Sequence, residues 1–289
     1  MKSFSEIQEL ENTLMVVDAL NLAFRWKHSG ALEFKDEFIR TIDSLRKSYK
    51  AKYVVIACDK GSSAYRKSIY PDYKQNRKDK YETQTPEEQR AFELFFEEFN
   101  ETIQEIEKQG RYVIFRFDKV EADDIAAYIV KKRKFFPVDR IVLVSSDKDW
   151  DLLIKPGIIR FSYVTRKETT HDNWNSHYDC DPDEYISIKC LQGDSGDNVP
   201  GVPGIGPKKA LLLVKEYGSA YDIIASLPIQ SKYKYIQALN EFGVENLMRN
   251  YQLMDLMEFC EEAIGDTNCH HINTVLGDYV SAGKIANGV

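Results

Sequence analysis

Leu14-Met15-Val16-Val17-Asp18 is a short apolar run that ends on an acidic residue. Similar short apolar runs recur along the first two thirds of the chain, at 53–57, 112–117 and 141–144, with longer helical patterns between them. Such alternation is typical of a largely parallel sheet that is covered by helices. We therefore expect an α/β fold with a mostly parallel central sheet flanked by helices.

Acidic residues follow each of these predicted strands. Ligands in open α/β sheets bind beyond the carboxyl ends of the strands, so the acids should converge on one crevice. A further pair of acids lies in Asp194-Ser195-Gly196-Asp197. The candidate metal ligands are Asp18, Asp59, Glu121, Asp123, Asp124, Asp147, Asp149, Asp194 and Asp197.

A simpler interpretation exists for each acid alone, because Asp after a strand often caps the next helix and the 194–197 stretch could be a turn. As a set, the acids would repel one another strongly unless cations neutralised them. Ligation by oxygen alone favours Mg²⁺ or Mn²⁺ over zinc. Glu121 and Asp124, three residues apart at a helix start, can face one ion. Two such ions would support phosphodiester hydrolysis by in-line displacement.

The formal net charge of −7 hides an uneven distribution. Residues 60–80 contain seven basic and two acidic side chains, a local balance of +5, which predicts a surface that contacts phosphates. Two divalent ions would bring the formal charge from −7 to −3. The acidic composition therefore does not exclude a nucleic-acid partner.

Composition places the chain among globular proteins, with 43% hydrophobic residues and no internal repeat. No apolar run approaches the roughly 20 residues that span a bilayer, and residues 1–13 are acidic and polar, unlike a signal peptide. We expect a cytoplasmic protein without membrane contact. The five cysteines lack metal-binding spacing, so we expect reduced and mostly buried thiols.

Two local patterns predict further elements. Thr85-Pro86-Glu87-Glu88 is a capping box that begins a long helix, whose phenylalanines recur at core-packing spacing. The glycines at 201–206, followed by Pro207, predict a tight hairpin that opens onto a helix ending at Gly218. Such a helix-hairpin-helix brings backbone N–H groups to a phosphate, and Lys208 and Lys209 add charge. The alternative is a bare turn between two helices.

The run GDSGDNVPGVPGIGPKKALLLVKEYGS at 193–219 resembles a segment of the 5′ nuclease domains of bacterial DNA polymerase I. MVVDALNLAFR, YPDYKQNRKDKY, VEADDIAAYIV and SSDKDWDLL also resemble segments of that family, in the family's order. The resemblance extends from about 14 to about 227. It is strongest to the stand-alone flap endonucleases of tailed bacteriophages.

The resemblance implies a role for each group of residues. A first metal would be held by Asp18, Asp59, Glu121, Asp123 and Asp124, and a second by Asp147, Asp149, Asp194 and Asp197. Lys74 and Arg77 would contact the scissile phosphate from the base of a helical arch, with Lys74 stabilising transition-state charge. Further DNA contacts are expected from Arg25, Tyr73, Tyr81, Gly204, Gly206, Lys208 and Lys209, with the two tyrosines stacking on unpaired bases. The hairpin of such proteins often holds K⁺.

These observations predict a structure-selective 5′ nuclease, both flap endonuclease and 5′-3′ exonuclease, that uses two or more Mg²⁺ ions, with Mn²⁺ able to substitute. Its partners would be DNA with 5′ flaps, 5′ ends or junctions, and RNA primers, in DNA replication. We expect a monomer with a nuclease core at 1–185, including an arch at about 60–107. A helical region at 186–289 would contain the helix-hairpin-helix at about 186–218.

Two alternatives remain open. A metal-dependent phosphatase or ribonuclease could use a similar sheet, but the helix-hairpin-helix and the basic stretch argue against a small-molecule phosphatase. A non-catalytic DNA-binding protein would have little use for nine uncompensated acids. Lys148, between Asp147 and Asp149, departs from what a cation site favours, although its side chain could point outward.

Overall fold

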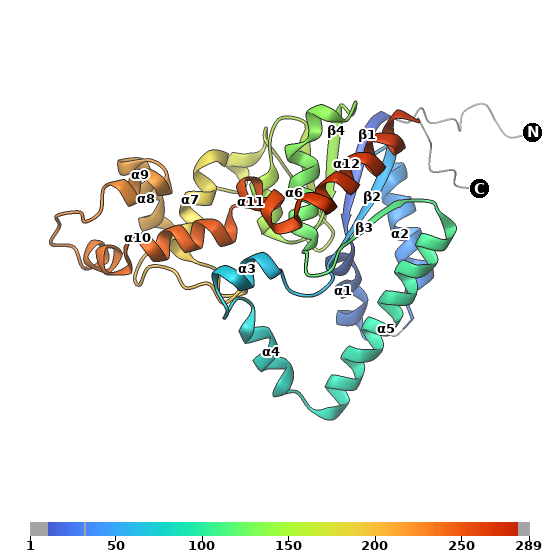
Figure 1. Cartoon of the computed structure of the whole chain (residues 1–289), viewed down its shortest axis with the longest axis horizontal. Helices are drawn as coiled ribbons and strands as arrows, with labels where there is room; N and C mark the ends of the chain where they lie inside the picture. Colours follow the sequence, from blue (N-terminus) through green and yellow to red (C-terminus); the bar gives the residue numbers. More distant parts are fainter. Residues whose placement is uncertain (1–10, 32, 283–289) are drawn as a thin grey trace, which may run out of the picture.

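The computed structural model describes residues 11–31 and 33–282. Within those residues, six strands form one sheet in the order β3-β2-β1-β4-β5-β6 (Figure 1). The strands are β1 (Glu11–Asp18), β2 (Ala51–Cys58), β3 (Val113–Arg116), β4 (Arg140–Val144), β5 (Ile158–Ser162) and β6 (Lys167–Thr170). The prediction that the N-terminus is not a signal peptide rests mainly on residues 1–10, which lie outside the described residues.

Helices connect and extend the sheet. Around the sheet lie α1 (Ala19–Ser29), α2 (Lys35–Ser48), α3 (Ala64–Ile69), α4 (Gln75–Glu82), α5 (Pro86–Gln109), α6 (Ala122–Lys131) and the 3-10 helix η3 (Lys148–Leu153). Later in the chain come α7 (Pro182–Gln192), α8 (Pro207–Tyr217), α9 (Ala220–Ala225), α10 (Lys234–Met254), α11 (Leu256–Ile264) and α12 (Asp266–Ser281). The predicted α/β class is confirmed.

The four predicted strands are all present and parallel to one another, as β1, β2, β3 and β4. The sequence reading missed β5 and β6, of which β6 runs antiparallel at the edge. β1 lies between β2 and β4, so the strand order reverses at the carboxyl end of β1. Crevices for ligands open at such a reversal, and Asp18 is the last residue of β1.

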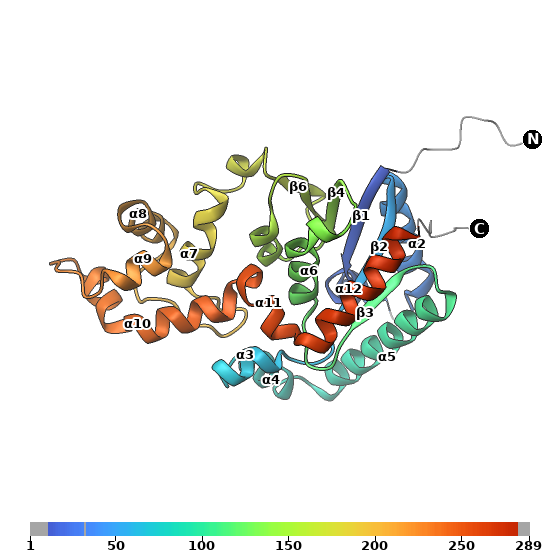
Figure 2. The same cartoon turned by 45° about the horizontal axis from the view of Figure 1, so that its top comes forward.

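Side chains of the central strands alternate between two apolar layers. Leu14 and Val16 point to the face covered by α6, α11 and α12. Met15 and Val17 point to the opposite face, which is covered by α1, α2 and α5 (Figure 2). Burial on both faces fixes the register of β1, because a slip of one residue would exchange its two sets of side chains.

A separate apolar cluster holds α7, α8, α9 and α10 together as a helical lobe. The chain then returns to the sheet, where α11 packs on α6 and α12 reaches β3 (Figure 1). The hydroxyl of Tyr53 on β2 donates to the backbone carbonyl of Val280, 3.0 Å away. The predicted domain boundary near residue 186 is therefore not a boundary of the core, because the core around the sheet contains residues from before and after this position.

The helices α4 and α5 form two arms that meet at an angle below the carboxyl ends of the strands (Figure 1). The capping box predicted for α5 is present, with Thr85 Oγ1 accepting from the backbone N–H of Glu88 and the Glu88 side chain accepting from Thr85 N–H. Lys74 precedes α4 in the left-handed region, at φ 56°. This sharp change of direction starts the arch.

The cysteines and the apolar character of the helices were also predicted from the sequence. All five cysteines are free and buried, as predicted. In the part of the chain that the structure describes, no helix is both long and apolar enough to cross a membrane.

Candidate metal and nucleic-acid site

A cavity of about 780 Å³ opens at the carboxyl ends of the parallel strands. Its lining includes eight of the nine predicted acids: Asp18, Asp59, Glu121, Asp123, Asp147, Asp149, Asp194 and Asp197. The acids come from β1, β2, α6 and its N-cap, the segment after β4, and the turn after α7. The prediction that acids distant in sequence converge on one crevice is correct for these eight.

Several of these acids also cap helices. For an acid after a strand, a capping role and a predicted role as metal ligand are therefore compatible. Asp18 caps α1 by accepting from the backbone N–H of Asn21 at 3.2 Å, and its other oxygen accepts from Ser145 Oγ at 2.8 Å. Asp59 accepts from the backbone N–H of Ala122 at 3.0 Å. These bonds leave each side chain in a fixed orientation at the cavity wall.

The ninth acid, Asp124, does not line the cavity, which argues against the prediction that it is a metal ligand. It is fully buried, and both carboxylate oxygens accept from the guanidinium of Arg66, at 2.7 and 2.8 Å. Asp123 faces the cavity instead, where Trp150 Nε1 donates to it at 2.6 Å. Successive helical residues point about 100° apart, so Asp123 and Asp124 cannot both face one ion.

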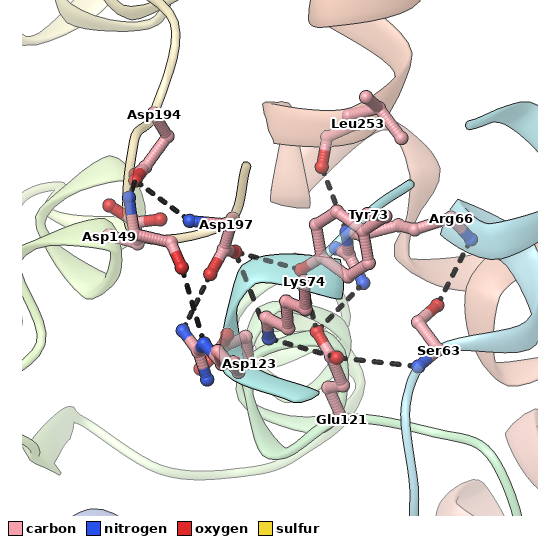
Figure 3. A network of polar contacts seen from close by, with 12 residues as sticks. Ser63, Arg66, Tyr73, Lys74, Glu121, Asp123, Asp149, Asp194, Asp197 and Leu253 are labelled. Carbon is pink, nitrogen blue, oxygen red and sulfur yellow. Dashed lines mark hydrogen bonds and ion pairs between the residues drawn. The ribbon is translucent and has the colours of Figure 1, made fainter. Parts of the chain in front are cut away.

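Arg66 belongs to the basic stretch that was predicted to contact phosphates, but it is only 3% exposed. Besides Asp124, it donates to the carbonyl oxygen of Leu253 at 2.8 Å (Figure 3). Its guanidinium also lies 3.5 Å from Glu121. Arg66 therefore ties α3 to α6 and to the end of α10, and it is unavailable to DNA.

Lys74 reaches into the acid cluster from the base of the arch (Figure 3). Its Nζ lies 2.9 Å from Oε1 of Glu121 and 3.7 Å from Oδ2 of Asp197. These two carboxylates raise the pKa of Lys74 against the opposing effect of burial. Its ammonium group therefore stays charged at the point where acids from the core and from the helical lobe meet.

Tyr73 is only 3% exposed, which argues against the expectation that it stacks on unpaired bases. Its hydroxyl donates to Glu121 at 3.0 Å and to Asp197 at 2.9 Å (Figure 3). Burial is the largest cause that raises its pKa. Tyr73 therefore links one predicted ligand of each metal.

Hydrogen bonds fasten the base of the arch to the turn that carries Asp194 and Asp197. Arg77 Nη2 donates to Asp197 Oδ1 at 2.6 Å, and its Nε donates to the carbonyl of Gly196 at 3.2 Å. Asn76 Nδ2 donates to the carbonyl of Ser195 at 2.8 Å. Arg77 thus lies beside the cavity as predicted, while most of its side chain is exposed.

Lys189 of α7 is a functional candidate that the sequence reading missed. Its Nζ lies 2.6 Å from Asp149 Oδ1 and 3.4 Å from Asp194 Oδ2. It sits on a helix with little amphipathic pattern, so only a comparison of spatial neighbours could identify it. Lys148 lies between Asp147 and Asp149 in the sequence. Its side chain is exposed, in agreement with the prediction that it could point outward.

Crowding of the acids shifts their pKa values. Burial raises the pKa of Asp18, and neighbouring Asp59 adds to this; burial also raises that of Asp123, with Asp147 adding to it. Burial raises the pKa of Asp149 to about 6 although Lys189 opposes this. Glu121 differs, because Lys74 and Arg66 outweigh the effect of burial and lower its pKa to about 2. Most of the cavity thus holds more negative charge than its lysines compensate.

Within residues 11–31 and 33–282, no three acidic, histidine or cysteine side chains come close enough to surround one ion. The ammonium groups of Lys74 and Lys189 lie between the acids, and each compensates one acid from the core and one from the turn after α7. An ion that binds here must therefore draw the acids together.

Aromatic side chains also line the cavity. Phe24 of α1, Tyr81 of α4, and Phe92 and Phe96 of α5 line it. Tyr81 packs against Phe92 with ring centroids 5.6 Å apart. Phe95, like the other deep members of the predicted stripe, is buried in the core, but Phe92 and Phe96 are available at the cavity surface.

The predicted hairpin lies between α7 and α8. The backbones at Gly193 and Gly201 cross so closely that a Cβ on Gly201 would lie 1.8 Å from the carbonyl oxygen of Gln192. Gly204, Gly206 and Lys208 are exposed. Lys209 is exposed too, but its Nζ donates to the carbonyl of Gly204 at 2.8 Å, so part of its hydrogen-bonding capacity is used within the hairpin.

Two family models match nearly the whole chain. Residues 13–179 match the 5′-3′ exonuclease N-terminal resolvase-like domain, and residues 180–272 match the 5′-3′ exonuclease C-terminal SAM fold. A flap endonuclease of Escherichia phage T5 is 41% identical over 267 residues, which cover 90% of each chain. A 5′-3′ exonuclease of Aquifex aeolicus is 28% identical over 224 residues, covering 76% of this chain and 70% of the relative.

Solved structures give the same result. A phage T5 flap endonuclease in a pseudo-enzyme-product complex with DNA and metal ions superposes with a TM-score of 0.88 at 38% identity, over 93% of this chain and 99% of the other. A phage T5 5′-exonuclease with bound zinc gives a TM-score of 0.87 at 38% identity, over 95% of this chain and 100% of the other.

Proposed function

This chain belongs to the 5′-3′ exonuclease and flap endonuclease family, and from that premise we propose that it hydrolyses phosphodiester bonds in branched or 5′-ended DNA. The observation that carries this function is one cavity whose lining includes eight carboxylates and several aromatic rings. The acids suit a metal-dependent reaction at phosphate. The rings suit unpaired bases.

The residues present fit hard divalent cations, with Mg²⁺ as the natural ion and Mn²⁺ as a substitute. Every candidate ligand is a carboxylate oxygen, and burial, with neighbouring carboxylates adding to it, raises the pKa values of Asp18, Asp123 and Asp149. Asp18, Asp59, Glu121 and Asp123 would hold one ion, and Asp147, Asp149, Asp194 and Asp197 another. When bound, such ions supply positive charge that favours ionisation of an attacking water and neutralises phosphate oxygens.

Two basic residues of the site, Lys74 and Arg77, act on the phosphate, and a third, Lys189, acts on the acids. Lys74 is charged and held at the meeting point of Glu121 and Asp197, so its ammonium group can donate to a phosphate oxygen as charge develops there. Arg77 offers a planar guanidinium beside it at the arch base, which suits a phosphate oxygen pair. Lys189 compensates Asp149 and Asp194 until an ion takes over that role.

Elements outside the cavity position the nucleic acid. Gly204, Gly206 and Lys208 are exposed at the start of α8 and suit the backbone of the duplex beside the cut, where a K⁺ ion can join through carbonyl oxygens. Tyr81 and the neighbouring phenylalanines suit unpaired bases of the flap. Removal of flaps and RNA primers during replication, by a monomer in the bacterial cytoplasm, is the role that we propose.

Cleavage of a labelled 5′-flapped duplex tests this function. With Mg²⁺ we expect cutting near the junction, and with EDTA none. A blunt duplex and a linear single strand of the same sequence serve as controls for structure selectivity. Survival of the flap after prolonged incubation with saturating Mn²⁺ would overturn the proposal, and cleavage of RNA or small phosphate esters in place of the flap would favour the alternative classes.

A further inference from the structure

Two arginines from distant parts of the chain converge on one tyrosine outside the cavity. Arg25 lies on α1, and Tyr163 and Arg166 lie in the turn that joins β5 to β6. The guanidinium carbon of Arg25 lies 4.5 Å from the centroid of the Tyr163 ring, and that of Arg166 lies 4.2 Å from it. Arg25 Nη1 and Arg166 Nη2 both donate to the Tyr163 hydroxyl oxygen, the latter at 3.2 Å.

This arrangement leaves positive charge uncompensated. Among the residues that the structure describes, neither Arg25 nor Arg166 forms an ion pair with a carboxylate, although both are exposed. Within residues 11–31 and 33–282, the acceptor that they share is the neutral oxygen of Tyr163. Two cations held on one neutral group repel each other, and an anion that accepts from both relieves this repulsion. Guanidinium groups are especially suited to the oxygens of a phosphate.

The turn that carries Tyr163 and Arg166 is fixed to the rim of the metal site. The backbone N–H of Val164 donates to Ser146 Oγ at 3.1 Å, and the backbone N–H of Ser146 donates to Asn21 Oδ1 at 2.9 Å. Asn21 lines the cavity, and Ser146 directly precedes Asp147. The arginine pair therefore lies a short distance from the acids, on the side of α1.

The shape of the turn presents its basic residues outward. Arg166 has a left-handed backbone, at φ 57°, and its N–H donates to the carbonyl of Ser162 at 2.9 Å. Val164 at the tip is 76% exposed, and Lys167 is exposed as well. A basic tip without a packing partner, held rigidly beside a site for DNA, suits contact with the strand that leaves the site.

We propose that Arg25, Tyr163 and Arg166 form a binding site for a backbone phosphate of DNA outside the cavity. The inference rests on the proposed function, and it goes beyond the expected phosphate contact of Arg25 by adding a second arginine and the ring that aligns both. Tyr163 orients the two guanidinium groups before DNA arrives. The contact is independent of base sequence and contributes to affinity, because it reaches the DNA backbone outside the cavity that holds the acids.

Binding of a 5′-flapped duplex in EDTA, measured over a range of salt concentrations, tests the site without cleavage. We expect Arg166→Ala to weaken binding roughly tenfold, as loss of one charge-assisted contact does. The slope of log affinity against log salt should fall by about 0.9, the value for one phosphate. Arg40→Ala, which removes an exposed arginine of α2, is the charge-matched control and should leave the slope unchanged.

The role of the ring is tested by Tyr163→Leu, which we expect to weaken binding almost as much as Arg166→Ala, whereas Tyr163→Phe retains the stacking and loses less. If both arginines hold one phosphate, Arg25→Ala and Arg166→Ala combined should lose less affinity than the sum of the single changes. In single-turnover cleavage, Arg166→Ala should lose more rate at subsaturating than at saturating DNA. Melting temperatures near the wild-type value confirm that each variant is folded.

Equal affinity and salt slope for Arg166→Ala and Arg40→Ala would overturn the inference, and so would additive losses in the double variant. These outcomes differ from failure of the proposed function. If the wild type binds DNA through Arg166 but does not cut it, the nuclease proposal fails alone. If the wild type cuts the flap and Arg166→Ala binds normally, only the phosphate site fails.

Discussion

The ammonium group of Lys74 lies 2.9 Å from a carboxylate oxygen of Glu121. Lys74 stands at the start of the arch, and Glu121 caps the helix that carries the central acids, so this ion pair joins the two parts of the site. Because the pair is nearly buried, its charges interact more strongly than an exposed pair would. The arch base and the acid cluster therefore act as one unit.

Lys74→Ala is expected to slow the chemical step by about 10²- to 10³-fold, because a preorganised donor to the developing charge is lost. DNA affinity should change far less. Single-turnover rates and binding measurements in EDTA separate the two effects. Lys78→Ala, at an exposed lysine of the same arm, is the control and should affect binding only. Equal losses of rate and affinity for Lys74→Ala would show a positioning role.

Asp123→Asn and Asp124→Asn should have opposite effects, since the two neighbours face different surroundings. Asp124→Asn removes the carboxylate that pairs with both ends of the buried Arg66 guanidinium and leaves only the longer contact with Glu121, at a cost of about 3 kcal/mol in the free energy of unfolding. Asp123→Asn should retain stability and raise the Mg²⁺ concentration for half-maximal cleavage more than about tenfold. Urea denaturation and Mg²⁺ titration give both quantities. If Asp124→Asn had a normal free energy of unfolding but a changed Mg²⁺ titration of cleavage, Asp124 would be a metal ligand after all.

Tyr73→Phe removes one hydroxyl and keeps the buried ring. Glu121 and Asp197 then lose a shared donor, so we expect the Mg²⁺ requirement to rise on the order of 10- to 100-fold, with the rate largely restored at saturating Mg²⁺. A role in base stacking predicts the reverse, because phenylalanine stacks as well as tyrosine. An unchanged Mg²⁺ titration would therefore contradict the linking role.

The acid cluster predicts an unusual pH dependence for the metal-free protein. A carboxyl group whose pKa is higher in the folded than in the unfolded state contributes stability at low pH, and this contribution is lost as the pH rises through the folded value. Asp149, with a pKa of about 6, and the raised Asp18 and Asp123 all have this sign. In EDTA, the titration of Asp149 should lower the melting temperature as the pH rises from about 4 to about 6. Added Mg²⁺ should stabilise the protein most at the upper end of that range.

Much of the site follows from short-range patterns. An apolar run that ends in an acid predicts both a strand and the place of its acid, and the prediction is correct for Asp18 and Asp59. The parallel order of the strands then brings distant acids together. Lys74 and Arg77 at the cavity follow from the motif around them.

The remaining features depend on partners far away in the sequence. Helical spacing shows that Asp123 and Asp124 point in different directions, but it does not reveal that Arg66, 58 residues earlier, lies beneath Asp124. Lys189 and Asp149 are 40 residues apart. From the sequence, Tyr73 is expected to be an exposed aromatic residue of a basic loop. Its burial depends on the turn that contains Asp197, which is distant in the sequence.

The return of the chain end to the sheet has a consequence for biosynthesis. The hydrogen bond from Tyr53 to Val280 closes a loop of 227 residues, and α11 and α12 supply the last apolar side chains of one sheet face. That face stays exposed to solvent until α11 and α12 have left the ribosome. Contacts between such distant segments slow folding, so newly made chains depend on the final 27 residues of the described range, 256–282, to bury their sheet.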